Sequence, residues 1–224
     1  MTKAVIFDMF ETLVSMFSGD TYFSEDMAHD MNLPFDEYRK AWHTTEHDRS
    51  CGFCTIEGGI KTTLELLGYY SEASVKLIAG KRRENLEGIF ERTPKETLEM
   101  LQALKDKGIK IGLISNCYSD EADVIRHSTI FPYLDVAMLS YEQGICKPDP
   151  EIYRRAMVEL GVSPQECLYV GDGGSKELFA ARDLGMRTLQ AQYFAELAFE
   201  PHIPCYKLDD FDHAYALSDI LKFI

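Results

Sequence analysis

Four short stretches of this chain carry residue types that can bind a phosphate group or transfer it. Each offers a carboxylate, a cation or a small hydrogen-bond donor, and the stretches are spread along the chain. Their candidate residues are Asp8, Thr12, Ser115, Asn116, Lys147, Asp172, Gly173, Gly174 and Glu177. Together they predict a site that holds an anion, with Asp8 as the nucleophile that attacks it and Thr12 close behind it in the same stretch.

Asp8 and Asp172 supply the chemistry that such a site needs first. Asp8 can attack phosphorus and carry the phosphoryl group, but its negative charge repels the substrate. A cation must therefore intervene, and Asp8 with Asp172 can hold Mg²⁺, which prefers carboxylate and water ligands. Glu177 follows in the same stretch as Asp172 and is a third candidate ligand. Lys147 adds a fixed positive charge that keeps Asp8 ionised and offsets the phosphate.

Small polar groups are expected to hold the phosphoryl oxygens. The side chains of Ser115 and Asn116 can donate hydrogen bonds to them. The backbone of Gly173 and Gly174 can do the same, and phosphoryl transfer needs little beyond positioning and charge neutralisation. Each stretch alone also has a purely structural interpretation: helix capping for Ser115-Asn116, a surface turn at Lys147 and a tight turn at the two glycines.

The stretch around Asp8 predicts where the site must lie. Residues 4–7 form a compact apolar run, Ala-Val-Ile-Phe, and Asp8 follows at once. Such a run is typical of a buried parallel strand that delivers the next side chain to solvent at its C-terminal end. In open α/β sheets, ligands bind outside the carboxyl ends of the strands. We therefore expect the site at that edge of a sheet.

From residue 93 onward, strand-like apolar runs alternate with helical patterns. Helices are predicted at residues 94–107, 119–127, 150–160, 175–184 and 211–221, and strands at residues 110–115, 135–139, 167–171, 187–190 and 205–208. Repeated alternation of this kind predicts an α/β fold with a doubly wound, mostly parallel sheet.

Residues 15–91 show a different pattern, without a convincing strand. Helices are predicted at residues 22–31, 35–47, 55–67 and 72–89, the last of them weakened near Gly80. Four consecutive helices after the first strand predict a small inserted bundle that folds as its own subdomain. The expected domains are core residues 1–14, the four-helix bundle at 15–91 and core residues 92–224.

Composition narrows the classes of function. A net charge of −14 argues against binding to nucleic acid or to an anionic membrane surface. No apolar run reaches the ~18 residues that a membrane-spanning helix needs, and no secretory signal is recognisable. The six cysteines are scattered along the chain, and without an export signal they are expected to be reduced thiols of a cytoplasmic protein.

In their order and spacing, the four stretches resemble the motifs of the haloacid dehalogenase-like (HAD) hydrolase superfamily. The residues that match its four motifs are Asp8, Ser115, Lys147 and Asp172. The helical residues 15–91 resemble the cap that the family carries between its first two motifs. The resemblance covers nearly the whole chain and implies a Rossmann-like core, a mobile helical cap and, usually, a Mg²⁺-dependent phosphatase.

Phe10 is the position at which the chain departs from that family. Family phosphatases usually carry a second Asp there as general acid and base, and the backbone carbonyl of this residue is a metal ligand. Phe cannot move a proton, and on an extended segment the side chain of Glu11 points in a different direction from its neighbour. The acid of a phosphatase-like hydrolase would then come from the cap, from Glu11 or from water.

Two other interpretations stay open. The dehalogenase branch of the family has an aromatic residue at position 10 and needs no Mg²⁺, and Arg39, Lys147 and Tyr153 also resemble that branch. It lacks a metal-binding carboxylate at position 172, however, whereas this chain has Asp172 and Glu177. The third interpretation is a non-catalytic binder of a phosphorylated ligand. The phosphatase is favoured, with a small phosphorylated (or, in the alternative, halogenated) molecule as partner and a monomer or homodimer as the expected state.

The second helix of the predicted cap and the loop after it hold further candidates. Arg39 and Arg49 are candidate binders of a substrate anion. A Cys₂His₂ zinc site is also geometrically possible, because two histidines lie four residues apart on a helix just before a CxxC sequence. Its four residues are His43, His47, Cys51 and Cys54. The alternative is a solvated helix face followed by two free thiols.

Overall fold

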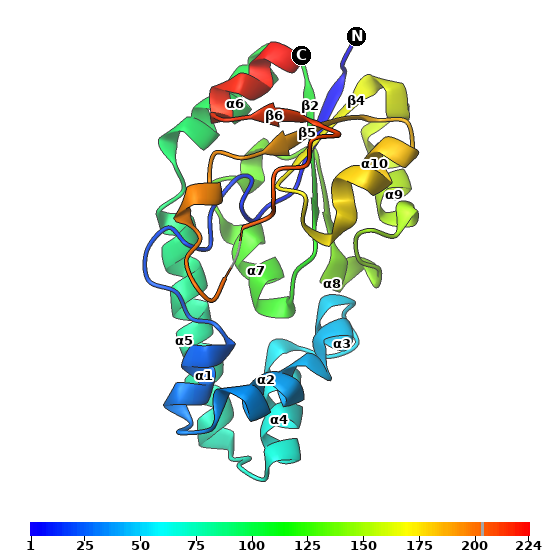
Figure 1. Cartoon of the computed structure of the whole chain (residues 1–224). Coiled ribbons are helices and arrows are strands. Elements are labelled where there is room, and N and C mark those ends of the chain that lie inside the picture. Colours follow the sequence, from blue (N-terminus) through cyan, green and yellow to red (C-terminus); the bar gives the residue numbers. More distant parts are fainter. Residues whose placement is uncertain (203) are drawn as a thin grey trace.

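The computed structural model describes residues 1–202 and 204–224, and its centre is a six-stranded β-sheet. The strands lie in the order β3-β2-β1-β4-β5-β6, and every neighbouring pair is parallel. Their bounds are β1 Ala4–Phe7, β2 Lys110–Ser115, β3 Val136–Leu139, β4 Cys167–Gly171, β5 Arg187–Ala191 and β6 Asp212–Ala214. The predicted α/β fold with a doubly wound parallel sheet is confirmed (Figure 1).

Strand β1 lies in the middle of the sheet because it is apolar on both faces. Its four residues are completely buried, and it pairs with β2 on one side and with β4 on the other. The chain winds outward from β1 to β2 and β3, then crosses to β4, β5 and β6 on the other side. Asp8 and Asp172, which follow β1 and β4, therefore meet at the point where the winding direction reverses.

Helices cover both faces of the sheet (Figure 1). Alternate residues of β1 point to opposite faces: Val5 and Phe7 pack in one apolar cluster with α6 and α7, whereas Ala4 and Ile6 pack in another with α9 and α10. The bounds of these helices are α6 Lys95–Asp106, α7 Ser119–His127, α9 Pro150–Leu160 and α10 Glu177–Asp183, and the short α8 Ser140–Gln143 follows β3.

Residues 15–91, called the helical segment below, contain five helices and an apolar cluster of their own. Their bounds are α1 Ser24–Asp30, α2 Phe35–His43, α3 Glu46–Ser50, α4 Ile56–Leu67 and α5 Glu72–Glu91. The cluster joins residues of α1, α2, α4 and α5, with Tyr38, Ile60 and Leu64 completely buried. Figure 1 shows α1, α2 and α4 at the end of the molecule opposite the two chain termini.

Two helix predictions for this segment need correction. The expected helix at 35–47 is divided, because the hydroxyls of Thr44 and Thr45 donate to the carbonyls of Ala41 and Trp42 and end α2 there. The predicted four helices are therefore five. The expected weakening near Gly80 is absent, and α5 runs through it without interruption. No helix among the described residues is long and apolar enough to cross a membrane.

The end of the chain also differs from the prediction. Residues 205–208 form no strand, because they bind a side chain of β5 instead of its backbone: the Gln190 amide donates to the Tyr206 carbonyl and accepts from the backbone of Leu208. The backbone of β5 pairs instead with β6, within the range predicted as a helix. A 3₁₀ helix, Leu217–Phe223, follows, and the Asp219 carboxylate caps its start.

Candidate active site

Lys147 lies at the centre of a buried cluster of charges at the carboxyl end of the sheet. Its ammonium donates to Oδ1 of Asp8 at 2.5 Å and also to Oε2 of Glu177. Asp8 is 8% exposed, whereas Glu177 is completely buried. Glu177 Oε2 also accepts a hydrogen bond from the phenol of Tyr169, at 2.9 Å. Glu177 and Lys147 thus form a support behind Asp8, which is the most exposed of the three.

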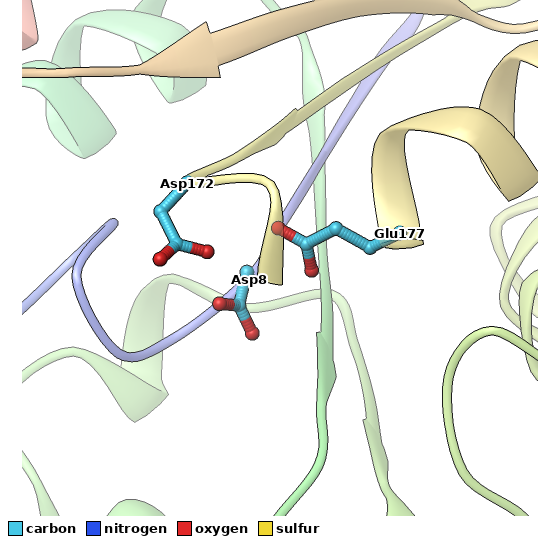
Figure 2. Close-up of side chains that lie close together, drawn as sticks. All are labelled: Asp8, Asp172 and Glu177. Atoms are coloured by element: carbon cyan, nitrogen blue, oxygen red, sulfur yellow. The ribbon is translucent and has the colours of Figure 1, made fainter. Parts of the chain in front are cut away.

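Asp172 approaches the same cluster from the end of β4 (Figure 2). One carboxylate oxygen from each of Asp8, Asp172 and Glu177 can be chosen so that all three lie within 4.8 Å of one another. Asp172 Oδ1 accepts from the backbone of Gly174 at 2.8 Å, and its carbonyl accepts from Gln190 at the same distance. These bonds fix the orientation of Asp172 toward Asp8, so one cation can contact both carboxylates.

The loop between Asp172 and Glu177 has an unusual backbone. Gly173, Ser175 and Lys176 all have positive φ, with values of 105°, 51° and 55°. Such angles cost free energy in residues other than glycine, and they recur in loops that bind ligands. The Gly173 N–H donates to Glu177 Oε1 at 3.2 Å. The left-handed residues also correct a prediction: α10 begins at Glu177 and not at Ser175.

The charges of this cluster do not balance. Three carboxylates, Asp8, Asp172 and Glu177, face the single ammonium of Lys147. Burial raises the pKa of Glu177 to about 8, with Asp8 adding to the rise. Burial likewise raises the pKa of Asp8, while Lys147 opposes the rise and Asp172 adds to it. Carboxylates crowded in this way are relieved by a proton or by a cation, and a divalent cation between Asp8 and Asp172 would take the place of the proton.

Asn116 holds the chain around Lys147 in place. The backbone N–H of Lys147 donates to Asn116 Oδ1 at 2.7 Å, and the Asn116 amide donates to the Lys147 carbonyl at 3.0 Å. The same amide lies 3.3 Å from the hydroxyl of Ser175. Ser115, just before it, is completely buried at the end of β2. The structure thus brings together Ser115-Asn116, Lys147 and the loop that follows Asp172.

The residues directly after Asp8 form a tight turn. Phe10 packs against Phe90 of α5 in an edge-to-face arrangement with the ring centres 6.2 Å apart. Glu11 has a φ of 55°, and its carboxylate turns back to accept hydrogen bonds from Ser15 and from the backbone of Met16, both at 2.7 Å. Burial raises the pKa of Glu11 to about 7. The Thr12 side chain is buried, and its hydroxyl is without a partner among the described residues.

The arginines singled out in the sequence lie outside this cluster. Arg39 is exposed on α2, 3.8 Å from Asp36. Arg49 is completely buried, with its guanidinium 3.5 Å from the centre of the Trp42 ring and 4.7 Å from that of Tyr118. It also donates to the Trp42 carbonyl at 2.8 Å. In this structure Arg49 joins the helical segment to the residue at the start of α7.

The four residues of the possible zinc site do not converge. His43 hydrogen-bonds Glu46 at 2.7 Å, and the Cys51 sulfur lies 3.8 Å from His47 and 2.7 Å from Cys146. Asp8, Asp172 and Glu177 form the only group of three or more potential metal ligands within the described ranges.

Sequence reasoning did not single out Tyr169, Ser175 or Gln190. Tyr169 offered a signal, because a hydroxyl in a buried strand needs a hydrogen-bond partner, and that partner is Glu177. Ser175 and Gln190 offered none, since their roles depend on which loops meet in space.

The chain belongs to the haloacid dehalogenase-like hydrolase family. The model of this family matches residues 2–185, a range that runs from β1 through α10 and contains all four predicted stretches. The resemblance drawn from the sequence is thereby confirmed.

Three proteins illustrate what the chain is similar to. The chain is 30% identical over 95 residues to a phosphoserine phosphatase of Thermus thermophilus, a match that covers 42% of this chain and 38% of that one. It shares 22% identity and a TM-score of 0.70 with a 2-haloacid dehalogenase of Pseudomonas syringae, over 99% and 97% of the two chains. A HAD enzyme of Bacteroides thetaiotaomicron, solved with magnesium and phosphate, shows 18% identity and a TM-score of 0.61, over 86% and 95%. The first curated relatives match over less than half of their own length, and the structural similarities show the shared fold.

Proposed function

We propose that the protein is a Mg²⁺-dependent phosphatase of a small phosphomonoester, acting through an aspartyl phosphate at Asp8. The observation that carries this proposal is Asp172, which faces Asp8 and gives the site more carboxylates than Lys147 can balance. A carboxylate pair without a metal would repel a phosphate, whereas the same pair with a divalent cation attracts it.

The carboxylates at the carboxyl edge of the sheet suit a single Mg²⁺ ion. Asp8 and Asp172 would hold it, with the carbonyl of Phe10 as the ligand that the family resemblance implies. Both oxygens of Glu177 already accept hydrogen bonds, from Lys147 and Tyr169 on one side and Gly173 on the other. Glu177 therefore acts in this proposal as a support for Lys147 more than as a ligand. The bound metal would supply charge neutralisation between Asp8 and the phosphate.

Each protein group then has one task in the reaction. Asp8 attacks phosphorus, and Lys147 holds its carboxylate in position and compensates charge on the phosphoryl oxygens. In this proposal the Ser115 hydroxyl would donate to those oxygens. The backbone N–H groups of Gly173 and Gly174, predicted for the same task, already donate to Glu177 and Asp172. Asn116 is used differently from the prediction, since its amide is committed to the backbone of Lys147. The P–O bond to the alcohol breaks as Asp8 attacks, and the alcohol leaves with a proton supplied by the cap, Glu11 or water. Water then attacks the acyl phosphate, which releases inorganic phosphate and frees Asp8.

A second candidate is the dehalogenase reaction, in which Asp8 attacks carbon and releases halide. It is favoured by the aromatic residue at position 10, which packs against Phe90, and by Tyr153, which is buried beside the cluster with its hydroxyl 3.3 Å from the Glu177 carbonyl. Asp172 argues against it, because an alkyl halide needs no metal. Binding of a phosphorylated ligand without turnover is the third outcome to be tested.

The helical segment is proposed as the cap that selects the substrate. The core groups recognise only the phosphate, whereas α1–α4, which lie beyond the carboxyl end of the sheet (Figure 1), would supply the other contacts to the substrate. Closure of such a cap would also exclude water.

We further propose a cytoplasmic protein, a monomer or homodimer, whose partner is a small phosphorylated molecule.

One experiment separates the three functions. The full-length protein, stripped of metal with a chelator, is assayed for phosphate release from a panel of phosphomonoesters and for halide release from 2-haloacids. We expect phosphate release that appears only when Mg²⁺ is restored. Halide release in the presence of chelator would establish the dehalogenase instead, and tight phosphate binding without turnover would establish the binder.

A further inference from the structure

Two thiols meet where the helical segment touches the core. Cys51 lies at the end of α3, and Cys146 directly precedes Lys147. Their sulfur atoms are 2.7 Å apart, against roughly 2.05 Å in a disulfide. We propose that Cys51 and Cys146 are a redox modification site, at which a reversible disulfide fastens the helical segment to the core beside the candidate active site.

The surrounding contacts hold the two sulfurs at this spacing. The hydroxyl of Ser140, at the start of α8, donates to the carbonyl of Ser50 at 2.7 Å. Gly52 has a φ of 74°, and its Cα lies so close to the Tyr141 carbonyl that a side chain would collide with it. The two segments therefore meet with backbone against backbone, and the thiols need only a small side-chain movement to bond.

The bond can form by exchange with a small-molecule disulfide such as oxidised glutathione. Cys146 is partly exposed, so its thiolate attacks the oxidant, forms a mixed disulfide and releases one thiolate. Cys51, only 4% exposed, then attacks the Cys146 sulfur and expels the second thiolate. The protons of Cys51 and Cys146 end on the two released glutathione thiolates. His47, 3.8 Å from Cys51, can accept the Cys51 proton before it reaches the released thiolate. The protein loses two electrons and the oxidant gains them.

The surroundings of Cys51 and Cys146 make the disulfide slow to form and slow to be reduced. Burial, together with the neighbouring Cys51, raises the pKa of Cys146 to about 12, so little thiolate exists at neutral pH. Once formed, the disulfide would resist reduction. When a reductant opens it, the two sulfurs stay in contact, so the disulfide forms again. A site of this kind responds to a sustained oxidising environment.

Cys54 provides an internal control. It completes the CxxC sequence with Cys51, which by sequence alone would be the expected pair. The structure brings Cys51 against Cys146 instead, although 95 positions separate them in the chain. A bond that closes so long a loop should restrict the unfolded chain strongly and raise the melting temperature.

The test uses the full-length protein with excess oxidised glutathione, followed by alkylation, digestion and mass spectrometry without reduction. We expect a peptide pair joined through Cys51 and Cys146, a mass decrease of about 2 Da for the two hydrogens lost, and a melting temperature that rises and returns with dithiothreitol. Cys54→Ser should behave like the natural chain. Cys51→Ser and Cys146→Ser should each lose both effects.

Several outcomes would overturn the inference. These are a Cys51–Cys54 bond, a glutathione adduct that stays on Cys146, alkylation of both thiols despite excess oxidant, or a bond that leaves the melting temperature unchanged. The effect on catalysis rests on the proposed function: turnover of an aryl phosphate should fall on oxidation and recover on reduction. If the reduced protein hydrolyses no phosphate ester, the proposed function fails while the mapped bond still decides the inference.

Discussion

Two buried clusters in this protein have the same composition, a cation between two carboxylates, yet different surroundings. Lys147 lies between Asp8 and Glu177 at the carboxyl edge of the sheet. The other cluster lies between α5 and α7, where one arginine side chain donates to two adjacent carboxylates. Its residues are Arg82, Asp120 and Glu121, all of them buried, with N–O distances of 2.8 and 3.0 Å.

The difference between them is what each leaves unpaired. The guanidinium of Arg82 is planar and binds Asp120 and Glu121 in separate directions, so it works as a joint between the helical segment and the core. Lys147 is a compact charge, and next to it stands Asp172, a third carboxylate that no cation contacts among the described residues. Buried ion pairs are thus no mark of a catalytic site by themselves. A carboxylate at a strand end that no cation neutralises is a stronger indication of a catalytic site.

The largest effect should come from changing the two clusters in parallel. Asp8→Asn removes the proposed nucleophile, and turnover should fall on the order of 10⁴–10⁶-fold while the protein stays folded. Asp120→Asn is the matched control, and it should lower the melting temperature but leave turnover of the folded protein nearly intact. Steady-state kinetics with thermal melts of both variants would check this. Normal turnover in Asp8→Asn would contradict the mechanism.

Phe10→Asp should show whether the site lacks a proton donor. A positioned acid and base contributes roughly 10²–10⁴-fold, so esters with poor leaving groups should be hydrolysed faster, and activated aryl esters should gain less. The change also removes a ring that packs against Phe90, so some stability will be lost. Phe10→Ala is the control, because it loses the ring without gaining a carboxylate.

Equal rates for folded Phe10→Asp and Phe10→Ala on every phosphate ester would contradict this prediction. The proton would then be handled by another group, or the reaction would not be phosphate hydrolysis.

Breaking the second cluster should cost stability. Arg82→Leu leaves Asp120 and Glu121 buried without their cation, and the free energy of unfolding should fall by about 3–5 kcal/mol. Urea denaturation would measure it. Arg83→Leu, on the exposed neighbour that pairs with Glu87 and Asp123, is the control and should change it by less than about 1 kcal/mol. Equal losses in the two variants would show that burial of the pair has no special effect.

The smallest effect should be stabilisation by the metal, and it needs no substrate. At a Mg²⁺ concentration of about 100 times its dissociation constant, binding should stabilise the folded state by about 2.7 kcal/mol. The melting temperature should rise in the natural chain and hardly change in Asp172→Asn. The Asp120→Asn protein should respond like the natural chain. A shift that survives in Asp172→Asn would place the metal elsewhere.

Much of the fold could be predicted from local patterns. The apolar run before Asp8 predicted a buried parallel strand, and the alternation after residue 93 predicted a mostly parallel sheet, because both depend on periodicities that neighbouring residues share. The predictions failed at residues 35–47, where the hydroxyls of Thr44 and Thr45 share the last carbonyls of α2 with the backbone. They also failed at residues 205–208, which bond the side chain of Gln190 instead of a strand.

For the site, the residue pattern was enough to identify the groups present and to predict that strand ends bring them to one edge. How each group is used became visible only in the folded chain: Glu177 supports Lys147, Asn116 is committed to backbone, and Cys51 meets Cys146 rather than Cys54. Hydrogen bonds and sulfur contacts act over a few ångströms. Which groups come that close depends on how segments far apart in the chain pack.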